Sequence, residues 1–152
     1  MTLELLMQSF TICKVYSLPP ELLAEEFFFV GKTDRELSLV CRTEAAPAET
    51  VAREDGWRAL RVEGTMDFSL VGILAELSGI LAEAGVSIFA VSTYDTDYIL
   101  VKEQQRKTAI DALAARGFDV RIPAGDTFCN ISTENVTGKQ LQSEVQSCKI
   151  NQ

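Results

Sequence analysis

Four polar side chains that can bind a small molecule stand close together between two strongly apolar runs. They are Ser92, Thr93, Asp95 and Asp97, within the stretch VSTYDTDYIL. Their carboxylates can receive a proton or a cation, and their hydroxyls can donate and accept hydrogen bonds. Asp, Ser and Thr are equally typical of tight reversals, because they hydrogen-bond their own backbone. The stretch therefore predicts either a solvated hairpin loop or a rim that contacts a ligand.

A second group of polar atoms lies at the start of the most regular helix in the sequence. In SLVGILAELSGILAEAG, residues 69–85, apolar side chains recur at spacings of three and four and form one broad face. The first amides of such a helix have no partner within it and lie at the positive end of its dipole, which suits a carboxylate. Those amides belong to Phe68, Ser69, Leu70 and Val71. In the plainer interpretation, Asp67 or Ser69 is a helix cap and binds nothing else.

The residue types that are missing narrow the chemistry. The chain has no histidine, which excludes Ser/His/Asp and Cys/His triads and histidine-ligated zinc. Its four cysteines are too widely scattered for a CxxC redox motif or a pair of zinc knuckles. We therefore expect no catalytic residue, no metal and no cofactor. A small enzyme with Asp67, Asp95 or Asp97 as its base is a less favoured alternative, because such a base needs a raised pKa in an enclosed pocket.

Charge and size restrict the partners. The net charge is −8 and there is no cluster of Lys and Arg, which argues against binding to nucleic acid or to an anionic membrane. With 152 residues and 47% hydrophobic content, the chain can form one ordinary domain or two very small ones that share a core. No apolar run approaches the roughly 20 residues that span a bilayer, and the N-terminus lacks a basic region before an apolar one. We expect a globular cytoplasmic protein.

The second half of the sequence predicts six elements in a recognisable order. These are a strand over 57–62, a helix over 69–85, strands over 86–91 and 98–101, a helix over 105–116 and a strand over 118–122. The order β-α-β-β-α-β is that of the ferredoxin-like α+β arrangement, in which two helices cover one face of a four-stranded antiparallel sheet. The polar stretch then forms the hairpin between the second and third strands.

The first 56 residues repeat this plan in a degenerate form. The repeat has expected strands over 10–16, 27–30 and 37–41, a short helix after Pro19–Pro20 and an Ala-rich stretch over 45–51. From Pro123 onward the composition turns to Ser, Thr, Asn and Gln, which indicates a tail that contributes little core. We expect a degenerate repeat over 1–56, a complete repeat over 57–122 and a polar C-terminal tail over 123–152.

Three runs of residues resemble a known family. They are LRVEG at 60–64, DFSLVGIL at 67–74 and GVSIFAVSTYDTDYILV at 85–101. These runs are similar to the ACT domains of small bacterial tandem-ACT proteins, to the ACT repeats of the CASTOR arginine sensors and, more distantly, to those of aspartate kinases. The resemblance covers about residues 8–122 and implies two tandem ACT-like repeats packed as one unit. It also implies a regulatory amino-acid-binding module without catalytic activity.

The resemblance further implies where the ligand binds. In ACT domains the ligand lies near the loop that enters the first helix and against strand residues of a facing unit, which correspond here to 65–70 and 92–97. A bound amino acid would place its carboxylate on the helix amides and its ammonium on an aspartate, with hydroxyls as neutral partners. The candidate ligand-binding residues are Asp67, Phe68, Ser69, Leu70, Ser92, Thr93, Asp95 and Asp97.

Open strand edges predict how such a unit assembles. A single ferredoxin-like unit leaves its edges unpaired, and pairing with the other repeat or with a second chain removes this liability. We expect a homodimer, or at least an intimate intramolecular pair, that binds a small molecule such as an amino acid. The sequence does not indicate which protein such a sensor would regulate. A purely structural dimerisation unit whose polar loops bind nothing is the main alternative.

Overall fold

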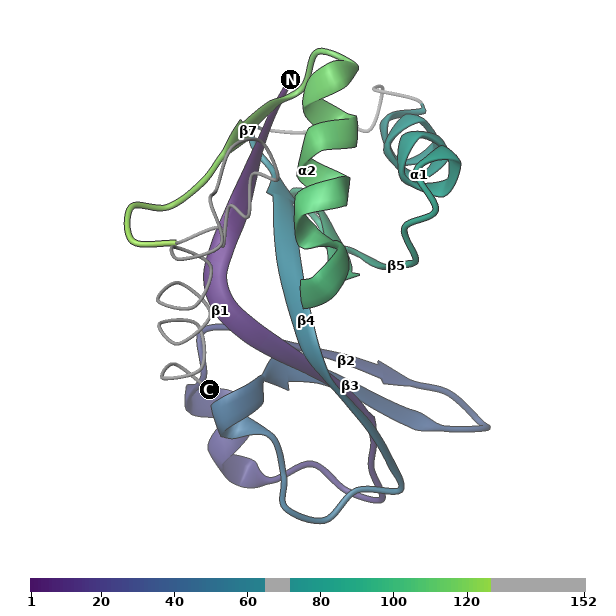
Figure 1. The fold of residues 1–152 in the computed structure, drawn as a ribbon. Coiled ribbons are helices and arrows are strands. Elements are labelled where there is room, and N and C mark those ends of the chain that lie inside the picture. The colour runs from purple at the N-terminus through teal and green to yellow at the C-terminus, as the bar shows by residue number, and fades with distance from the viewer. Residues whose placement is uncertain (65–71, 127–152) are drawn as a thin grey trace, which may run out of the picture.

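The computed structural model describes residues 1–64 and 72–126 (Figure 1). The strands are β1 Thr2–Lys14, β2 Phe28–Lys32, β3 Leu37–Arg42, β4 Ala52–Val62, β5 Ile88–Ser92, β6 Asp97–Lys102 and β7 Asp119–Arg121. The helices are α1 Ile73–Glu83 and α2 Arg106–Ala115, with short 3-10 helices η1 Pro20–Ala24, η2 Thr43–Ala45 and η3 Glu103–Gln105. The order from β4 to β7 confirms the predicted β-α-β-β-α-β series. None of the described helices is long and apolar enough to cross a membrane.

β1 joins the two repeats into one sheet. The strand order is β2-β3-β1-β4-β6-β5, and β7 pairs in parallel with β1. Leu3 of β1 lies opposite Val62 of β4 on one side and opposite Val120 of β7 on the other. In a free-standing ferredoxin-like unit the closing strand pairs with the first strand of the same repeat. Here the first strand of the chain lies between those two strands, so the repeats pack as one unit.

The two central strands are longer than the sequence indicates. β1 begins at Thr2 rather than Phe10, and β4 begins at Ala52 rather than Trp57. Each of these strands has neighbours on both sides. Pairing on both sides satisfies the backbone groups even in stretches whose side chains do not alternate cleanly. One such stretch is in β1, which changes register against β4 between Leu5 and Ser9.

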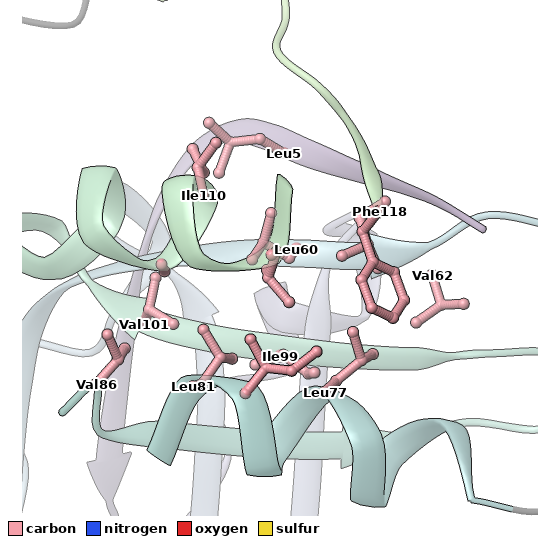
Figure 2. Packing of buried hydrophobic residues seen from close by; sticks show 14 of the residues in the cluster. Leu5, Leu60, Val62, Leu77, Leu81, Val86, Ile99, Val101, Ile110 and Phe118 are labelled. Carbon is pink, nitrogen blue, oxygen red and sulfur yellow. The ribbon is translucent and has the colours of Figure 1, made fainter. Parts of the chain in front are cut away.

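The two helices cover one face of the sheet and form the larger core with it (Figures 1 and 2). The buried side chains include Leu3, Leu5, Leu60, Val62, Leu77, Leu81, Ile99, Val101, Ala109 and Leu113. Both β1 leucines are fully buried in this cluster. The core beneath the helices of the second repeat therefore contains side chains from the first.

The opposite face of the sheet is covered by the sheet's own curl. β2 and β6 are separated by three strands in the sheet order, yet the rings of Phe29 and Tyr98 lie 5.1 Å apart between centroids. Only a strongly bent sheet brings these strands together, and Figure 1 shows β1 bending along its length. The aromatic side chains of residues 27–29 are partly buried and pack against the two smaller core clusters.

Candidate functional site

The polar stretch forms a hairpin whose loop satisfies its own backbone. Ser92 of β5 and Asp97 of β6 form the last pair of the ladder. Within the loop, the amide of Thr93 donates to the carbonyl oxygen of Thr96 over 2.8 Å. The Thr93 hydroxyl donates to the same carbonyl over 3.0 Å and accepts from the Thr96 amide over 3.3 Å. Thr93 thus has the ordinary role of a turn residue, and Asp95 is exposed at the loop.

One hydrogen bond fixes this hairpin at the end of β4. The Thr96 hydroxyl donates to the backbone carbonyl of Val62 over 2.6 Å. β4 and β5 are both antiparallel to β6 and run in the same direction, so the crossover through α1 begins at this end of the sheet. The described helix begins at Ile73, after Gly72 in a left-handed conformation with φ of 94°. Chain order therefore brings the start of the helix and the hairpin to the same end.

Asp97 is the buried acid of the hairpin. The residue is 7% exposed, and its Oδ1 accepts a 2.5 Å hydrogen bond from the hydroxyl of Ser92. Alternation along β6 places Asp97 on the same face as Ile99, which belongs to the helix-covered core. Within residues 1–64 and 72–126, no Lys or Arg forms an ion pair with this carboxylate. A buried charge is unfavourable unless it is paired, so Asp97 can accept a cation.

The nearest cation of β4 is held on the other side of the sheet. Arg61 lies opposite Tyr98, and alternation turns it away from the helix-covered face. It pairs with Glu4 and, over 3.1 Å, with Glu63. Burial by itself lowers the pKa of Arg61, but hydrogen bonds to Glu4, Tyr98 and Glu63 raise it overall. Arg61 is therefore fully charged and already neutralised by acids of its own face.

The structure brings half of the predicted site residues together. Ser92, Thr93, Asp95 and Asp97 lie in one hairpin, while the other four candidates, Asp67, Phe68, Ser69 and Leu70, lie outside the described residues. Their contact with a ligand stays a prediction. Thr96 lies within the predicted range 92–97 but is not one of the eight named candidates, and its place in the polar stretch is the signal for it.

Neither a metal cluster nor a surface hollow of the described chain competes with the hairpin. In the described ranges, no group of three or more Cys, Asp or Glu side chains is arranged to hold a metal ion. A shallow hollow lies between η1 and η2 and contains none of the candidate residues. Its lining is Pro19, Glu21, Leu22, Glu25, Ala45 and Pro47.

The architecture defines the fold class, and part of the chain matches a known family model. A curled antiparallel sheet with two helices on one face and the order β-α-β-β-α-β is a ferredoxin-like α+β fold. Residues 52–115 match the family model of the ACT domain. The segment from β4 to the end of α2 is therefore similar to an ACT domain.

Curated relatives are sensors by name. The rat protein named cytosolic arginine sensor for mTORC1 subunit 1 is 31% identical over 104 residues, which are 64% of this chain and 31% of the relative. The human protein of the same name is 30% identical over 107 residues, which are 66% of this chain and 32% of the relative. The chain thus spans about a third of the length of these relatives.

Solved structures share the fold. A crystal structure of a protein from Agobacterium tumefaciens is 27% identical, with a TM-score of 0.75 over 84% of this chain and 96% of that chain. The regulatory subunit of aspartate kinase from Thermus thermophilus is 10% identical, with a TM-score of 0.52 over 74% of this chain and 95% of that chain. At that identity the second likeness concerns the fold alone.

Proposed function

We propose that this chain is a non-catalytic regulatory module that binds an amino acid, with Asp97 as the acceptor of the ligand's ammonium. The observation that carries the proposal is the buried carboxylate of Asp97, which has a hydroxyl partner in Ser92 and no cationic partner among the described residues. The ACT domain match and the relatives named as arginine sensors support a regulatory role in amino-acid sensing.

The chemistry of a zwitterion fits this end of the sheet. An ammonium beside Asp97 forms a charge-assisted hydrogen bond and neutralises the buried charge. Asp95, exposed two residues earlier, offers a second acid for a basic side chain, so arginine is the first ligand to test. The other half of the site, residues 67–70 with their helix amides, enters the proposal from the sequence alone.

Assembly is part of the proposal. β5 is the last strand in the sheet order, and its outer edge has no strand partner among the described residues. Pairing of two copies through this side would make a homodimer and place a second unit near the hairpin. A ligand bound between units shifts their association only by its differential affinity for the two states. We propose a cytoplasmic location, in keeping with the relatives named as cytosolic sensors.

Thermal unfolding against each of the twenty amino acids tests the ligand. A ligand at 100 times its dissociation constant stabilises by about 2.7 kcal/mol, which raises the Tm of a chain of this size by roughly 5–10 °C. We expect one amino acid to do so, with arginine first. A dimer that forms or dissociates with that ligand, followed by light scattering, tests the assembly.

Two matched variants separate the site from general charge. Asp97→Asn is expected to abolish the ligand-induced shift while the protein stays folded. Asp34→Asn removes an exposed aspartate from the loop between β2 and β3 and is expected to leave the shift unchanged. No shift with any amino acid would contradict the proposal and favour a purely structural module. Turnover of the ligand would favour the enzyme alternative instead.

A further inference from the structure

A second charged cluster lies away from the hairpin, at the other end of the helical layer. It joins Arg58 of β4, Glu103 of η3, Arg106 of α2 and Asp126, which follows β7. Arg58 pairs in register with Val101, four residues along β6 from Asp97, or about 13 Å at the usual rise of a strand. The cluster is therefore separate from the candidate amino-acid site.

Two arginines hold the two oxygens of one buried carboxylate. Nη2 of Arg58 donates to Oδ2 of Asp126 over 2.7 Å, and Nη1 of Arg106 donates to Oδ1 over 2.6 Å. Both arginine side chains are 9% exposed and the Asp126 side chain is 8% exposed. The elements that supply these groups are far apart in the sequence, so the carboxylate site is built by the tertiary fold.

The arginines are positioned by more than Asp126. The register change in β1 frees the carbonyl of Leu6 from the ladder, and this oxygen accepts from Nη2 of Arg58 over 2.9 Å. Glu103, which is half exposed, contacts Arg58 over 3.3 Å and Arg106 over 3.2 Å. Among the described residues, both arginines therefore contact the carboxylates of Glu103 and Asp126.

An orphaned donor marks the same place. The Nε of Arg58 is buried and has no hydrogen-bond partner among the described residues, although buried polar atoms nearly always have one. Arg58 therefore has a free donor even with Asp126 bound. Burial alone raises the pKa of Asp126, but the hydrogen bond from Arg58 and the charges of both arginines outweigh it and hold this pKa below its usual 3.8. Asp126 is thus a carboxylate at neutral pH.

We propose that Arg58 and Arg106 form a carboxylate-binding site whose resident occupant is Asp126, and that a small free carboxylate can replace it. A planar guanidinium pair is suited to both oxygens of a carboxylate. A role in stability alone does not require these charges, because an apolar contact would hold the chain after β7 as well as a buried ion pair does. Because Asp126 is tethered close by, its effective concentration is high and it suppresses binding of free carboxylates in the unaltered chain. This inference does not rest on the proposed amino-acid site.

Chemical rescue of Asp126→Ala tests the site, with acetate as the probe in the full chain. We expect this variant to unfold at lower urea concentration than the unaltered chain, and acetate to restore the midpoint saturably in the millimolar range. Sodium chloride at equal ionic strength is expected not to restore it. In NMR spectra, the Nε–H resonance of Arg58 is expected to shift with the same acetate dependence. Asp126→Asn, which keeps the side-chain size, serves for the NMR titration if Asp126→Ala does not fold.

Three controls give the outcomes their meaning. Asp119→Ala removes an exposed carboxylate of β7 and is expected to show no acetate response. Arg106→Lys added to Asp126→Ala is expected to weaken acetate binding about tenfold, the equivalent of one charge-assisted hydrogen bond. Asp97→Asn added to Asp126→Ala is expected to keep the acetate response. The proposal for one site can therefore be contradicted without affecting the proposal for the other. Restoration by chloride equal to that by acetate, or an Arg58 Nε–H resonance that does not move, would overturn the site and leave a structural brace.

Discussion

Replacement of the exposed Ser92 by alanine is expected to destabilise the protein, although substitution of an exposed serine usually changes stability little. Surface substitutions away from special features change stability by about 0.5 kcal/mol or less. Ser92 is exposed, but its hydroxyl is the donor to the buried carboxylate of Asp97 over 2.5 Å. Ser92→Ala therefore leaves a buried charge without its donor.

The size of the effect follows from the charge on the acceptor. A hydrogen bond to a charged group contributes about 1.5–3 kcal/mol. Water can replace part of this at Ser92 because the residue itself is exposed, so we expect a loss of about 1–2 kcal/mol. With a urea m-value of about 2 kcal/mol per molar, the midpoint falls by roughly 0.5–1 M. The ligand proposal adds that this loss is recovered when a bound ammonium supplies a new donor to Asp97.

Urea unfolding at neutral pH measures the loss, with Ser87→Ala as the matched control. Ser87 is exposed just before β5, and its hydroxyl has no side-chain hydrogen bond among the described residues. In an Asp97→Ala background, Ser92→Ala is expected to cost less than about 0.5 kcal/mol, because the two side chains act as one unit. Equal effects of Ser92→Ala and Ser87→Ala would refute the reasoning that Asp97 is a buried charge held by one hydroxyl.

Three further predictions concern the core and pH. Leu77→Ala, at a fully buried position of α1, is expected to destabilise by about 2–5 kcal/mol in urea unfolding, whereas Leu23→Ala, which is 81% exposed, is expected to be nearly neutral. Burial raises the pKa of the Cys41 thiol from 9.0 to about 11. The stability that Cys41 contributes is therefore complete below pH 9 and falls as pH rises from 9 to 11, since the unfolded thiol ionises first. A Cys41→Ala variant is expected to reduce this slope without abolishing it, because burial also raises the pKa of the Cys13 thiol. A hydrogen bond from Thr11 and another from Arg53 lower the pKa of Asp55 from 3.8. The stability that Asp55 contributes is therefore lost as pH falls through its lowered pKa. Thr11→Val is expected to reduce this acid-dependent loss.

Local periodicity was enough to predict the elements of the second repeat. The apolar side chains between Leu70 and Ala84 recur at helical spacing, and the alternation of Trp57 to Val62 marks a strand. The polar stretch was correctly placed in a hairpin, because Asp, Ser and Thr between two apolar runs are typical turn residues. These features depend on neighbours in the sequence, and they needed no knowledge of the rest of the chain.

Long-range pairing was beyond the same reasoning. Nothing in the residues around Leu3 indicates that this strand lies between β4 and β7, because its partners are 59 or more residues away. Asp126 falls in a stretch whose composition predicts a polar tail, yet its carboxylate is buried between two arginines. Asp95 and Asp97 are both aspartates two residues apart, so the alternation of a strand would place them on the same face. Only the hairpin register makes Asp95 exposed and Asp97 buried.

The position of β1 determines how a signal from the hairpin can spread. The Thr96 hydroxyl donates a hydrogen bond to the carbonyl of Val62, and Val62 lies opposite Leu3 of β1. Leu3 in turn lies opposite Val120 of β7. A ligand that stabilises the hairpin therefore acts on a sheet shared by both repeats, and its binding free energy adds to the stability of the whole chain rather than of one repeat. A regulatory module needs this property, because occupancy of a small site must change the behaviour of a larger surface.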